Sequence, residues 1–312
     1  MRILVTGAGG FVGHYVVDHL LAAGEHTIHA LGRELDGLTL PSPQCWPLDL
    51  RHREAVHEAI DRIAPEVVIH LAGTTSVAES WASPKQTFET NVLATLNILE
   101  ALPPGMVTRW VNAGSAEEYQ PSPAKLQETF PLAPLSPYGT SKVAQEWLLQ
   151  QMAPRLKMEL WQFRAFNQTG PGQDTRFVVP SLALQVLQVK HHIISEVKVG
   201  DLSPIRDFMD VRDSSRVYAK AALGKIPPGT YNLCSGTGRS VESVLRDLCR
   251  LAGVEPTIAI DPARLRPADV PSLVGDASCL LEACQHSVLS FDWETTLLSL
   301  LRDLENFLAA SV

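Results

Sequence analysis

Apolar and polar positions along the first half of the chain follow two alternating spacings. Short apolar runs rich in β-branched residues, such as RILVT at 2–6, are typical of buried strands. Longer stretches carry apolar residues every three or four positions, which is typical of a helix with one buried side. In the helix expected at 11–24, that buried side comprises Val12, Val16, Leu20 and Leu21.

The order of these elements predicts the fold class. Strands are expected at 2–6, 26–31, 66–73, 108–114 and 158–166. The intervening helices are expected at 11–24, 53–63, 87–102 and around Tyr138 and Lys142. Because a strand, a helix and a further strand form a right-handed unit, this order predicts a parallel sheet with helices on both faces. The sequence thus predicts an α/β protein with a Rossmann-type doubly wound sheet.

The pattern loosens after residue 166, where prolines and glycines separate shorter segments with helices near 178–189 and 240–252. We expect this part to form a smaller C-terminal domain. The expected division is 1–166 with a return segment near 208–224 for the first domain, and 167–207 with 225–312 for the second.

Composition and charge exclude several classes of partner. The 312 residues are 45% hydrophobic and 19% charged, which is typical of a globular protein. A net charge of -8 and the absence of a basic run argue against nucleic-acid binding. No apolar run is long enough to cross a bilayer, so no membrane partner is expected. The chain enters its first strand at once, and we therefore expect no signal peptide.

The cysteines and histidines indicate neither a disulfide frame nor a metal site. Five cysteines are an odd number, and they lack C-x-x-C spacing, as expected for reduced thiols in a cytoplasmic protein. His191 and His192 have no carboxylate or cysteine partner at a ligand spacing, so we expect no metal.

A glycine-rich loop, VTGAGGFVG, lies between the first strand and the first helix. Gly7, Gly10 and Gly13 recur every third residue, a variant of the dinucleotide-binding fingerprint. Gly7 would permit the tight turn, Gly10 would let backbone N–H groups approach a pyrophosphate, and Gly13 would let helix and strand pack closely. Since the positive end of the helix faces the loop, the motif predicts a nucleotide cofactor. The same site would include Phe11, Val12, Leu50, Leu71 and Ala72.

The end of the second strand indicates which cofactor binds. An NAD site usually has an acidic residue about 20 residues past the loop, where this chain has Gly32 and Arg33. Arg33 can bind a 2′-phosphate through charge-assisted hydrogen bonds, so we expect NADP, with NAD as the alternative. Arg33 could also be a solvated loop residue, since Glu34 and Asp36 are close in sequence. Asp49 could reach the adenine amine or serve as an ordinary carboxylate at a helix start.

Motifs over most of the chain resemble one family. They include TGAGGFVG, HLAG, GSAEEY, SPYGTSK, RAFNQTGPGQ, RDFMDVRD and RPADVPSLVGD. The chain resembles the extended short-chain dehydrogenase/reductases that modify nucleotide sugars. It looks most like GDP-4-keto-6-deoxy-mannose reductases and GDP-mannose 4,6-dehydratases. The resemblance implies an NADP-binding first domain and a second domain that binds the nucleotide sugar.

The Tyr-x-x-x-Lys pair at Tyr138 and Lys142 would then be catalytic. Residues four apart share a helix face, so Lys142 can lie near Tyr138 and the cofactor ribose. A free tyrosine has a pKa of about 10, and we expect the ammonium and the positive nicotinamide to lower it. Tyr138 would be the general acid or base at a carbonyl or alcohol oxygen. Ser115, at a strand end, would hydrogen-bond the same oxygen, although a serine there could also be a turn cap.

The run GSAEEY bears on the type of reaction. In dehydratases of thymidine-linked sugars the family pattern after the serine or threonine is Asp-Glu, whereas this chain has Ala116 and Glu117. Glu117 could carry a proton, but Ala116 has none to give. GDP-mannose dehydratases also lack that aspartate, so Ala116 favours a reductase without excluding a dehydratase.

The resemblance also implies a set of substrate contacts. Asn167 would contact the substrate or its diphosphate, and Arg206 and Arg266 would bind the diphosphate or the sugar. Arg206 could instead pair with a neighbouring aspartate, and Arg266 could be a surface arginine. Trp81 lies where relatives line the sugar pocket, although a core tryptophan would fit as well.

These observations favour NADPH-dependent reduction of the C4 keto group of a nucleotide-linked 4-keto-6-deoxyhexose, with GDP as the expected nucleotide. A GDP-mannose 4,6-dehydratase and a sugar 4-epimerase are the alternative enzymes. A non-catalytic NADP sensor is the alternative outside enzymes, and the presence of Ser115, Tyr138 and Lys142 argues against it. We expect a homodimer, as in many relatives.

Overall fold

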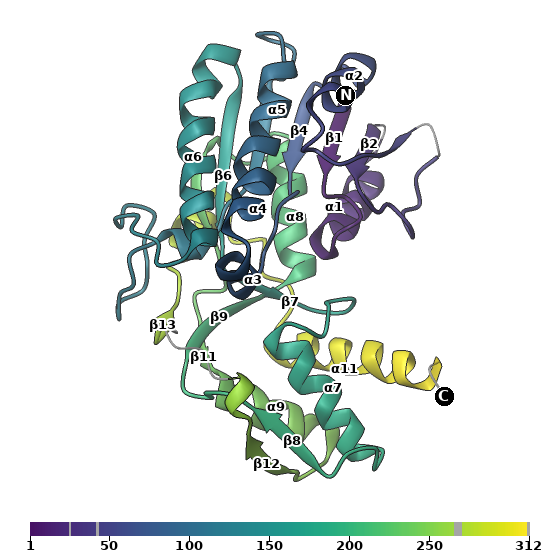
Figure 1. Ribbon diagram of the computed structural model, residues 1–312, viewed down its shortest axis with the longest axis vertical. Coiled ribbons are helices and arrows are strands. Elements are labelled where there is room, and N and C mark those ends of the chain that lie inside the picture. The colour runs from purple at the N-terminus through teal and green to yellow at the C-terminus, as the bar shows by residue number, and fades with distance from the viewer. Residues whose placement is uncertain (25, 42–43, 265–269, 311–312) are drawn as a thin grey trace.

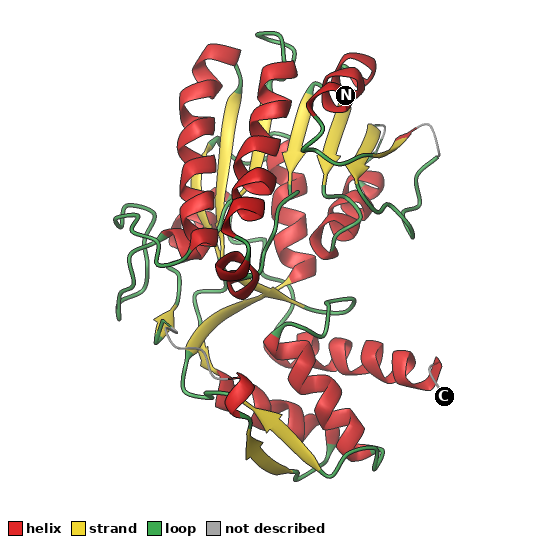
Figure 2. Ribbon diagram, in the orientation of Figure 1, coloured by secondary structure: helices red, strands yellow, loops and turns green. Residues whose placement is uncertain are grey.

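The structure is a computed structural model that describes residues 1–24, 26–41, 44–264 and 270–310. Two lobes are evident in Figure 1, a larger one that holds the N-terminus and a smaller one that holds the C-terminal helix. Figure 2 shows that the larger lobe contains a sheet between layers of helices.

The larger lobe is built on seven strands in the order β10-β6-β5-β4-β1-β2-β3. Every pair of neighbours in this sheet is parallel. The strands are β1 (Arg2–Thr6), β2 (Thr27–Gly32), β3 (Cys45–Pro47), β4 (Val67–His70), β5 (Arg109–Ala113), β6 (Glu159–Ala165) and β10 (Gly229–Leu233). The predicted doubly wound α/β fold is therefore confirmed.

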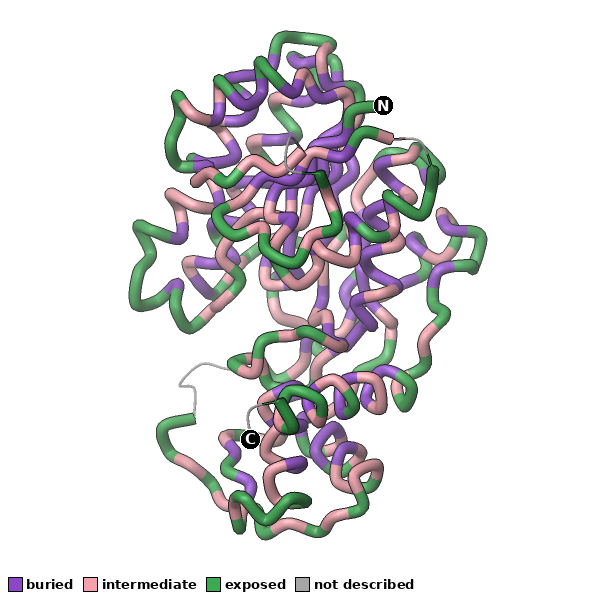
Figure 3. The backbone as a smooth tube through the Cα atoms, turned by 90° about the vertical axis from the view of Figure 1, so that its right-hand side faces the viewer, coloured by how far each residue is buried: buried purple, intermediate pink, exposed green. Residues whose placement is uncertain are grey.

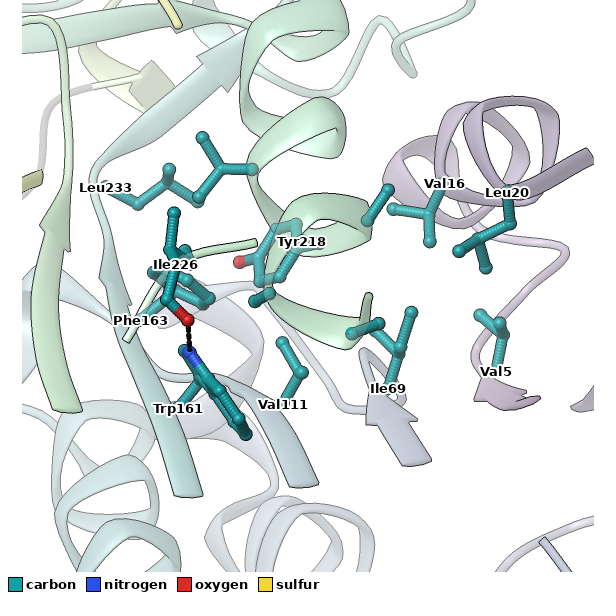
Figure 4. Close-up of a cluster of buried hydrophobic side chains, with 14 of the residues drawn as sticks. Val5, Val16, Leu20, Ile69, Val111, Trp161, Phe163, Tyr218, Ile226 and Leu233 are labelled. Carbon is teal, nitrogen blue, oxygen red and sulfur yellow. Dashed lines mark hydrogen bonds between the residues drawn. The ribbon is translucent and has the colours of Figure 1, made fainter. Parts of the chain in front are cut away.

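Helices cover both faces of this sheet, and the alternation of side chains along each strand decides which face each residue serves. On one face, Val5 and Ile69 pack against α1 (Phe11–Ala22) and α8 (Val211–Ala222), as Figure 4 shows. On the other face, Leu4 and Val68 pack with residues of α2 (Arg53–Ile63), α5 (Ala94–Ala101) and α6 (Pro137–Leu156). The buried apolar residues of the central strands thus alternate between two separate cores.

One residue of α1 that was predicted to lie in the core is exposed. Leu20 is fully buried, whereas Leu21 is 41% exposed, so the prediction that both belong to one buried side is wrong. Successive helical residues are rotated by about 100°, and the packed side of α1 is set by Val16, Val17 and Leu20.

The smaller lobe has its own core. It comprises α7 (Val178–Lys190), α9 (Val241–Ala252), α11 (Trp293–Ala310), β8 (Glu196–Val199) and β12 (Thr257–Ile260). Buried leucines and valines of the three helices pack together, among them Leu187, Leu248 and Leu300. Figure 3 shows buried backbone in both lobes and exposed loops around the smaller one.

A small group of strands connects the lobes. The central member, β9 (Ile205–Asp210), pairs with three shorter strands, β7 (Asn167–Thr169), β11 (Gly238–Ser240) and β13 (Ser272–Leu273). After β9 the chain returns through α8 to the larger lobe, within the segment predicted near 208–224.

The predicted domain boundary at 225 is wrong for two segments. Strand β10 pairs with β6 at the edge of the large sheet, and Leu233 joins its core. The helix α10 (Ser278–Ala283) also packs there through Leu280. Pairing of β10 with β6 and packing of α10 on β10 outweigh the irregular sequence pattern of these segments. Among the helices that the structure describes, none has the length and apolar character of a membrane span.

The contrast between Leu20 and Leu21 gives a test of this packing. We expect Leu20→Ala to lower the free energy of unfolding by about 2–5 kcal/mol, because it leaves a cavity between α1 and the sheet. The matched control Leu21→Ala should change it by no more than about 0.5 kcal/mol. Equal losses in urea unfolding would contradict the assignment of the two faces.

Candidate active site

A cavity of about 810 Å³ lies at the carboxyl edge of the large sheet and extends to the smaller lobe. Parallel α/β sheets bind ligands at this edge, where the strand order reverses, which here is between β1 and β4. The predicted cofactor residues all line this cavity: Gly7, Gly10, Phe11, Val12, Gly13, Arg33, Asp49, Leu50, Leu71 and Ala72. Ser115, Glu117, Tyr138, Lys142 and Asn167 line it as well.

The glycine loop leaves room for a ligand because side chains are missing at close backbone approaches. Gly7 has φ +69°, and a Cβ there would lie 2.7 Å from the Ala72 nitrogen. A Cβ at Gly13 would collide with the Gly7 carbonyl oxygen. Gly9, which the motif analysis did not single out, would collide with the Glu34 carbonyl oxygen in the same way. The adjacent glycines Gly9 and Gly10 are the feature of the sequence that could have predicted this close approach.

The N-terminus of α1 is open toward this loop. Gly10 is its N-cap, with extended backbone and no side chain to accept the first helical N–H groups. Those N–H groups and the helix dipole form a site for an anion such as a pyrophosphate. The loop, the cavity and this helix end therefore fit a dinucleotide cofactor.

Two guanidiniums and one carboxylate lie at the far end of the same cavity. Arg33 is exposed there, while Asp49 is bound by Arg51, whose Nη2 is 2.6 Å from Asp49 Oδ2. Hydrogen bonds from Arg51 lower the pKa of Asp49 to about 2. The Asp49 carboxylate is thus bound to Arg51 and is not available to bind an adenine amine. Arg51, which sequence reasoning missed, adds a second positive charge to this end of the cavity.

Ser115 and Tyr138 meet where β5 and α6 approach one another. Ser115 is the N-cap of the short turn η3 (Ala116–Glu118) that follows β5, and Tyr138 is in the first turn of α6. Both side chains line the cavity, and the Ser115 hydroxyl lies near the Tyr138 phenol. Both residues are largely buried, with 5% and 7% of their surface exposed.

Burial raises the pKa of Tyr138, and the charges of Glu117 and Glu118 raise it further, whereas the nearby Ser115 hydroxyl lowers it. The prediction that Lys142 lowers this pKa is therefore wrong for the protein alone. Lys142 Nζ instead donates to the Ala113 carbonyl oxygen at 2.8 Å and to Gln145 Oε1 at 3.3 Å. Burial lowers the pKa of Lys142 to about 8, while Glu118 opposes this change.

A buried polar network that the sequence did not reveal holds Lys142. Gln145 Nε2 donates to the Asn91 carbonyl oxygen at 2.9 Å and to Thr95 Oγ1 at 2.8 Å. Thr95 Oγ1 lies 2.8 Å from His70 Nε2, and burial lowers the pKa of His70 to about 3. A neutral His70 and a fully bonded Gln145 fix the end of the lysine side chain. The only hint of this network in the sequence is the presence of polar residues on otherwise apolar helix faces.

The structure places Asn167 at the cavity, and its role as a substrate contact stays a prediction. Asn167 lies on β7 and lines the cavity, and its Nδ2 has no hydrogen-bond partner among the described residues. A buried amide donor without a partner is costly, so it suits a ligand contact.

The other predicted substrate residues are placed differently. Arg206 is absent from the cavity lining, and its Nη1 donates to the carbonyl oxygens of Ile205 and Val270, at 2.9 and 2.7 Å. Trp81 is 62% exposed on α3 (Val77–Ala82), so it lines neither the cavity nor the core. On that short helix Ser80 faces inward, which turns the next residue outward. Arg266 lies outside the described residues.

The smaller lobe supplies an arginine that the sequence analysis missed. Arg176 lines the cavity just before α7, and its Nη1 lies 3.4 Å from Glu79 Oε1 on α3. This pair joins the two lobes across the cavity. Among the described residues, no group of three or more histidines, cysteines or carboxylates could hold a metal ion.

Comparisons with known proteins agree with this architecture. The family model described as GDP-mannose 4,6 dehydratase matches residues 4–285. A GDP-6-deoxy-D-mannose reductase from Pseudomonas aeruginosa is 35% identical over 274 residues, which cover 86% of each chain.

Two solved structures are similar over nearly the whole chain. The structure of RMD from Pseudomonas aeruginosa complexed with NADPH has a TM-score of 0.85 and 29% identity, and the match covers 98% of this chain and 99% of that one. A UDP-glucose 4-epimerase from Thermus thermophilus in complex with NAD gives the same TM-score, identity and coverage. The chain therefore belongs to the GDP-mannose 4,6 dehydratase family, within the extended short-chain dehydrogenase/reductases that comprise nucleotide-sugar oxidoreductases and epimerases.

Proposed function

We propose that this protein reduces the C4 keto group of GDP-4-keto-6-deoxymannose, or of a close nucleotide-linked analogue, with NADPH. The observation that carries the proposal is that Ser115, Tyr138 and Lys142 line the same cavity as the glycine loop. Identity of 35% to a GDP-6-deoxy-D-mannose reductase supports this choice of substrate.

Bound NADPH would supply the hydride. The open N-terminus of α1 and the loop around Gly7 and Gly13 would hold its pyrophosphate. Lys142, on the floor of the cavity, would hold the ribose through an ammonium already fixed by the Ala113 carbonyl oxygen.

The protonation state of Tyr138 suits the direction of reduction. Burial raises the pKa of Tyr138, so the phenol is protonated at neutral pH and can donate to an oxygen that gains negative charge. Ser115, which lines the cavity near the phenol, would orient the carbonyl by a second hydrogen bond. Two donors at one oxygen stabilise the developing alkoxide, and Tyr138 then completes the alcohol.

Two arginines support NADP rather than NAD. Arg33 and Arg51 both line the cavity beyond the glycine loop, and Asp49 neutralises only one of them. A 2′-phosphate would receive charge-assisted hydrogen bonds from the remaining guanidinium.

A second candidate function, 4,6-dehydration, is favoured by Glu117. This carboxylate lines the cavity on the turn after Ser115, where it could remove a proton from the sugar. Ala116 beside it also lines the cavity and offers no proton. We prefer reduction because it needs only the donors found at Ser115 and Tyr138.

We further propose a homodimer and a cytoplasmic location. Trp147 on α6 is 56% exposed and Leu93 before α5 is 51% exposed, which supports association through the tyrosine-bearing helix and its neighbour. The cysteines are free thiols in the structure, which is compatible with a reducing compartment.

The first prediction concerns the proton donor. We expect Tyr138→Phe to reduce kcat by about 10²–10⁴-fold with little change in NADPH affinity, because it removes only the hydroxyl. Tyr231→Phe is the matched control, since its hydroxyl donates to the Pro227 carbonyl oxygen and Tyr231 is absent from the cavity lining. Turnover near the wild-type value in Tyr138→Phe would remove this residue from the mechanism.

Cofactor choice gives the second prediction. Arg33→Ala should raise the Kd for NADPH more than that for NADH, because NADH has no 2′-phosphate. Arg246→Ala, an exposed arginine of α9 outside the cavity, should change neither Kd. Equal losses for both cofactors would show that Arg33 does not recognise the phosphate.

The proposed reaction is tested by cofactor stoichiometry. Purified protein is given GDP-4-keto-6-deoxymannose with NADPH and, separately, GDP-mannose with NADP. We expect one NADPH to be consumed for each keto sugar converted. Conversion of GDP-mannose to its 4-keto product without net change in cofactor would instead establish the dehydratase.

A further inference from the structure

Two carboxyl groups and one guanidinium form a buried cluster behind Ser115. Glu118 belongs to the turn η3, Glu146 to α6 and Arg164 to β6. Glu118 and Glu146 are fully buried, and Arg164 is 6% exposed. None of the three lines the cavity, so any effect on catalysis must act through the residues that they contact.

Arg164 is already matched by one of the carboxylates. Its Nε donates to Glu146 Oε2 at 3.0 Å and its Nη2 donates to Glu146 Oε1 at 2.7 Å, a bidentate pair. Its Nη1 donates to the Tyr119 hydroxyl at 3.0 Å and to the Glu128 carbonyl oxygen at 2.8 Å. The positive charge of this guanidinium is therefore balanced by Glu146.

Glu118 is bonded on one oxygen only. Its Oε1 accepts the backbone N–H of Ser115 at 2.6 Å. Its Oε2 has no N–H or O–H donor among the described residues, and Arg164 Nε, at 3.7 Å, is beyond hydrogen-bond distance. The Glu146 carboxyl group is close by, because Glu146 Oε2 and Glu118 Oε2 lie 3.0 and 3.7 Å from the same atom, Arg164 Nε. Two carboxyl groups can share a hydrogen bond only when one of them carries a proton.

The surrounding charges favour a proton on Glu118. Burial raises the pKa of Glu118 well above its usual range, and Glu146 raises it further, whereas the Ser115 N–H and Arg164 lower it. Burial opposes the charge of Glu146, but the bonds from Arg164 outweigh it, so the pKa of Glu146 is lowered. An isolated buried anion is costly, while a neutral acid in the same place satisfies both oxygens.

The other titratable groups near Glu118 are Tyr119 on the same segment and Tyr138 and Lys142 on α6. A negative charge on Glu118 would raise the pKa of each of them. Glu117, which precedes it in the turn, lines the cavity and is a separate carboxylate. The state of Glu118 thus affects the proton donor and the lysine of the site together.

We propose that Glu118 is a positioning residue for Ser115 that acts as a neutral carboxylic acid. Its Oε1 accepts the Ser115 N–H, and its proton is donated to Glu146. The inference rests on the proposed function, because the position of Ser115 matters only if Ser115 orients the substrate carbonyl. In this arrangement the turn is anchored to α6 and β6 without placing a second anion beside Tyr138.

Two variants separate the proton from the hydrogen bonds. Glu118→Gln keeps an acceptor for Ser115 and a donor for Glu146, so it imitates the neutral acid. Glu118→Val removes both and leaves the buried Ser115 N–H without an acceptor. If Glu118→Val does not fold, Glu118→Gln alone still tests the proton.

The proton is measured directly in the free protein, without substrate. The infrared spectrum at neutral pH should show the carbonyl stretch of a protonated carboxyl group, and Glu118→Gln should lose it. A protonated-carboxyl band that persists in Glu118→Gln, or none in the wild type, overturns the proposal.

The pH dependence of stability provides a second readout, and its sign follows from linkage. The pKa of Glu118 in the folded state lies above the unfolded value of about 4.3, so this group stabilises the fold at low pH and loses that effect as pH rises toward the folded pKa. From about pH 5 upward, the unfolding constant of the wild type should rise about tenfold per pH unit relative to Glu118→Gln. Parallel pH profiles for the two proteins would contradict the proposal.

The activity readout then tests the positioning role. Glu118→Gln should match the wild type in kcat at neutral pH and in the pH dependence of kcat, since both side chains are neutral. In Glu118→Val, kcat should fall about 10- to 100-fold with NADPH affinity retained, because the carbonyl is misplaced. A profile shifted to lower pH in Glu118→Gln would show that Glu118 is ionised in the wild type. If no sugar is reduced by any variant, the proposed function fails, while the infrared and stability results still decide the state of Glu118.

Discussion

The reversal of strand order between β1 and β4 is the constraint on which the site depends. β1 pairs with β2 on one side and with β4 on the other, so the chain leaves these neighbouring strands in opposite directions. The loops that follow them part at the carboxyl edge and leave a crevice. The two loops approach closely at its base, where any side chain on Gly7 would meet the Ala72 backbone. The cavity and the helix N-terminus beside it follow from this arrangement.

Burial, more than pairing of charges, determines the protonation of Tyr138 and Lys142. Burial raises the pKa of Tyr138 and lowers that of Lys142, so both changes favour the uncharged form. The ammonium of Lys142 is held by the Ala113 carbonyl oxygen and Gln145 rather than by a carboxylate. A neutral phenol beside Ser115 is a proton donor, and this is the state that reduction of a ketone requires.

Local motifs made much of the fold and of the cofactor end of the site predictable. The glycine loop, Leu71 and Ala72 directly follow strands that hydrophobic runs identify, and strand ends meet at one edge of a parallel sheet. The remainder depends on contacts between distant segments. Trp81 and Leu21 are exposed because the residues before them, Ser80 and Leu20, take the buried positions of their helices, and β10 joins the large sheet through pairing with β6. Likewise, the raised pKa of Tyr138 arises from burial that no spacing of residues reveals.

The central claim, that hydride from the cofactor ends on C4 of the sugar, is tested most directly by isotopic labelling. NADPH deuterated at both C4 positions of the nicotinamide ring is incubated with the protein and GDP-4-keto-6-deoxymannose, and the product sugar is analysed by mass spectrometry and NMR. Our account predicts one deuterium per product molecule, bonded to C4 of the hexose. A converted sugar that carries no deuterium at C4 would contradict it.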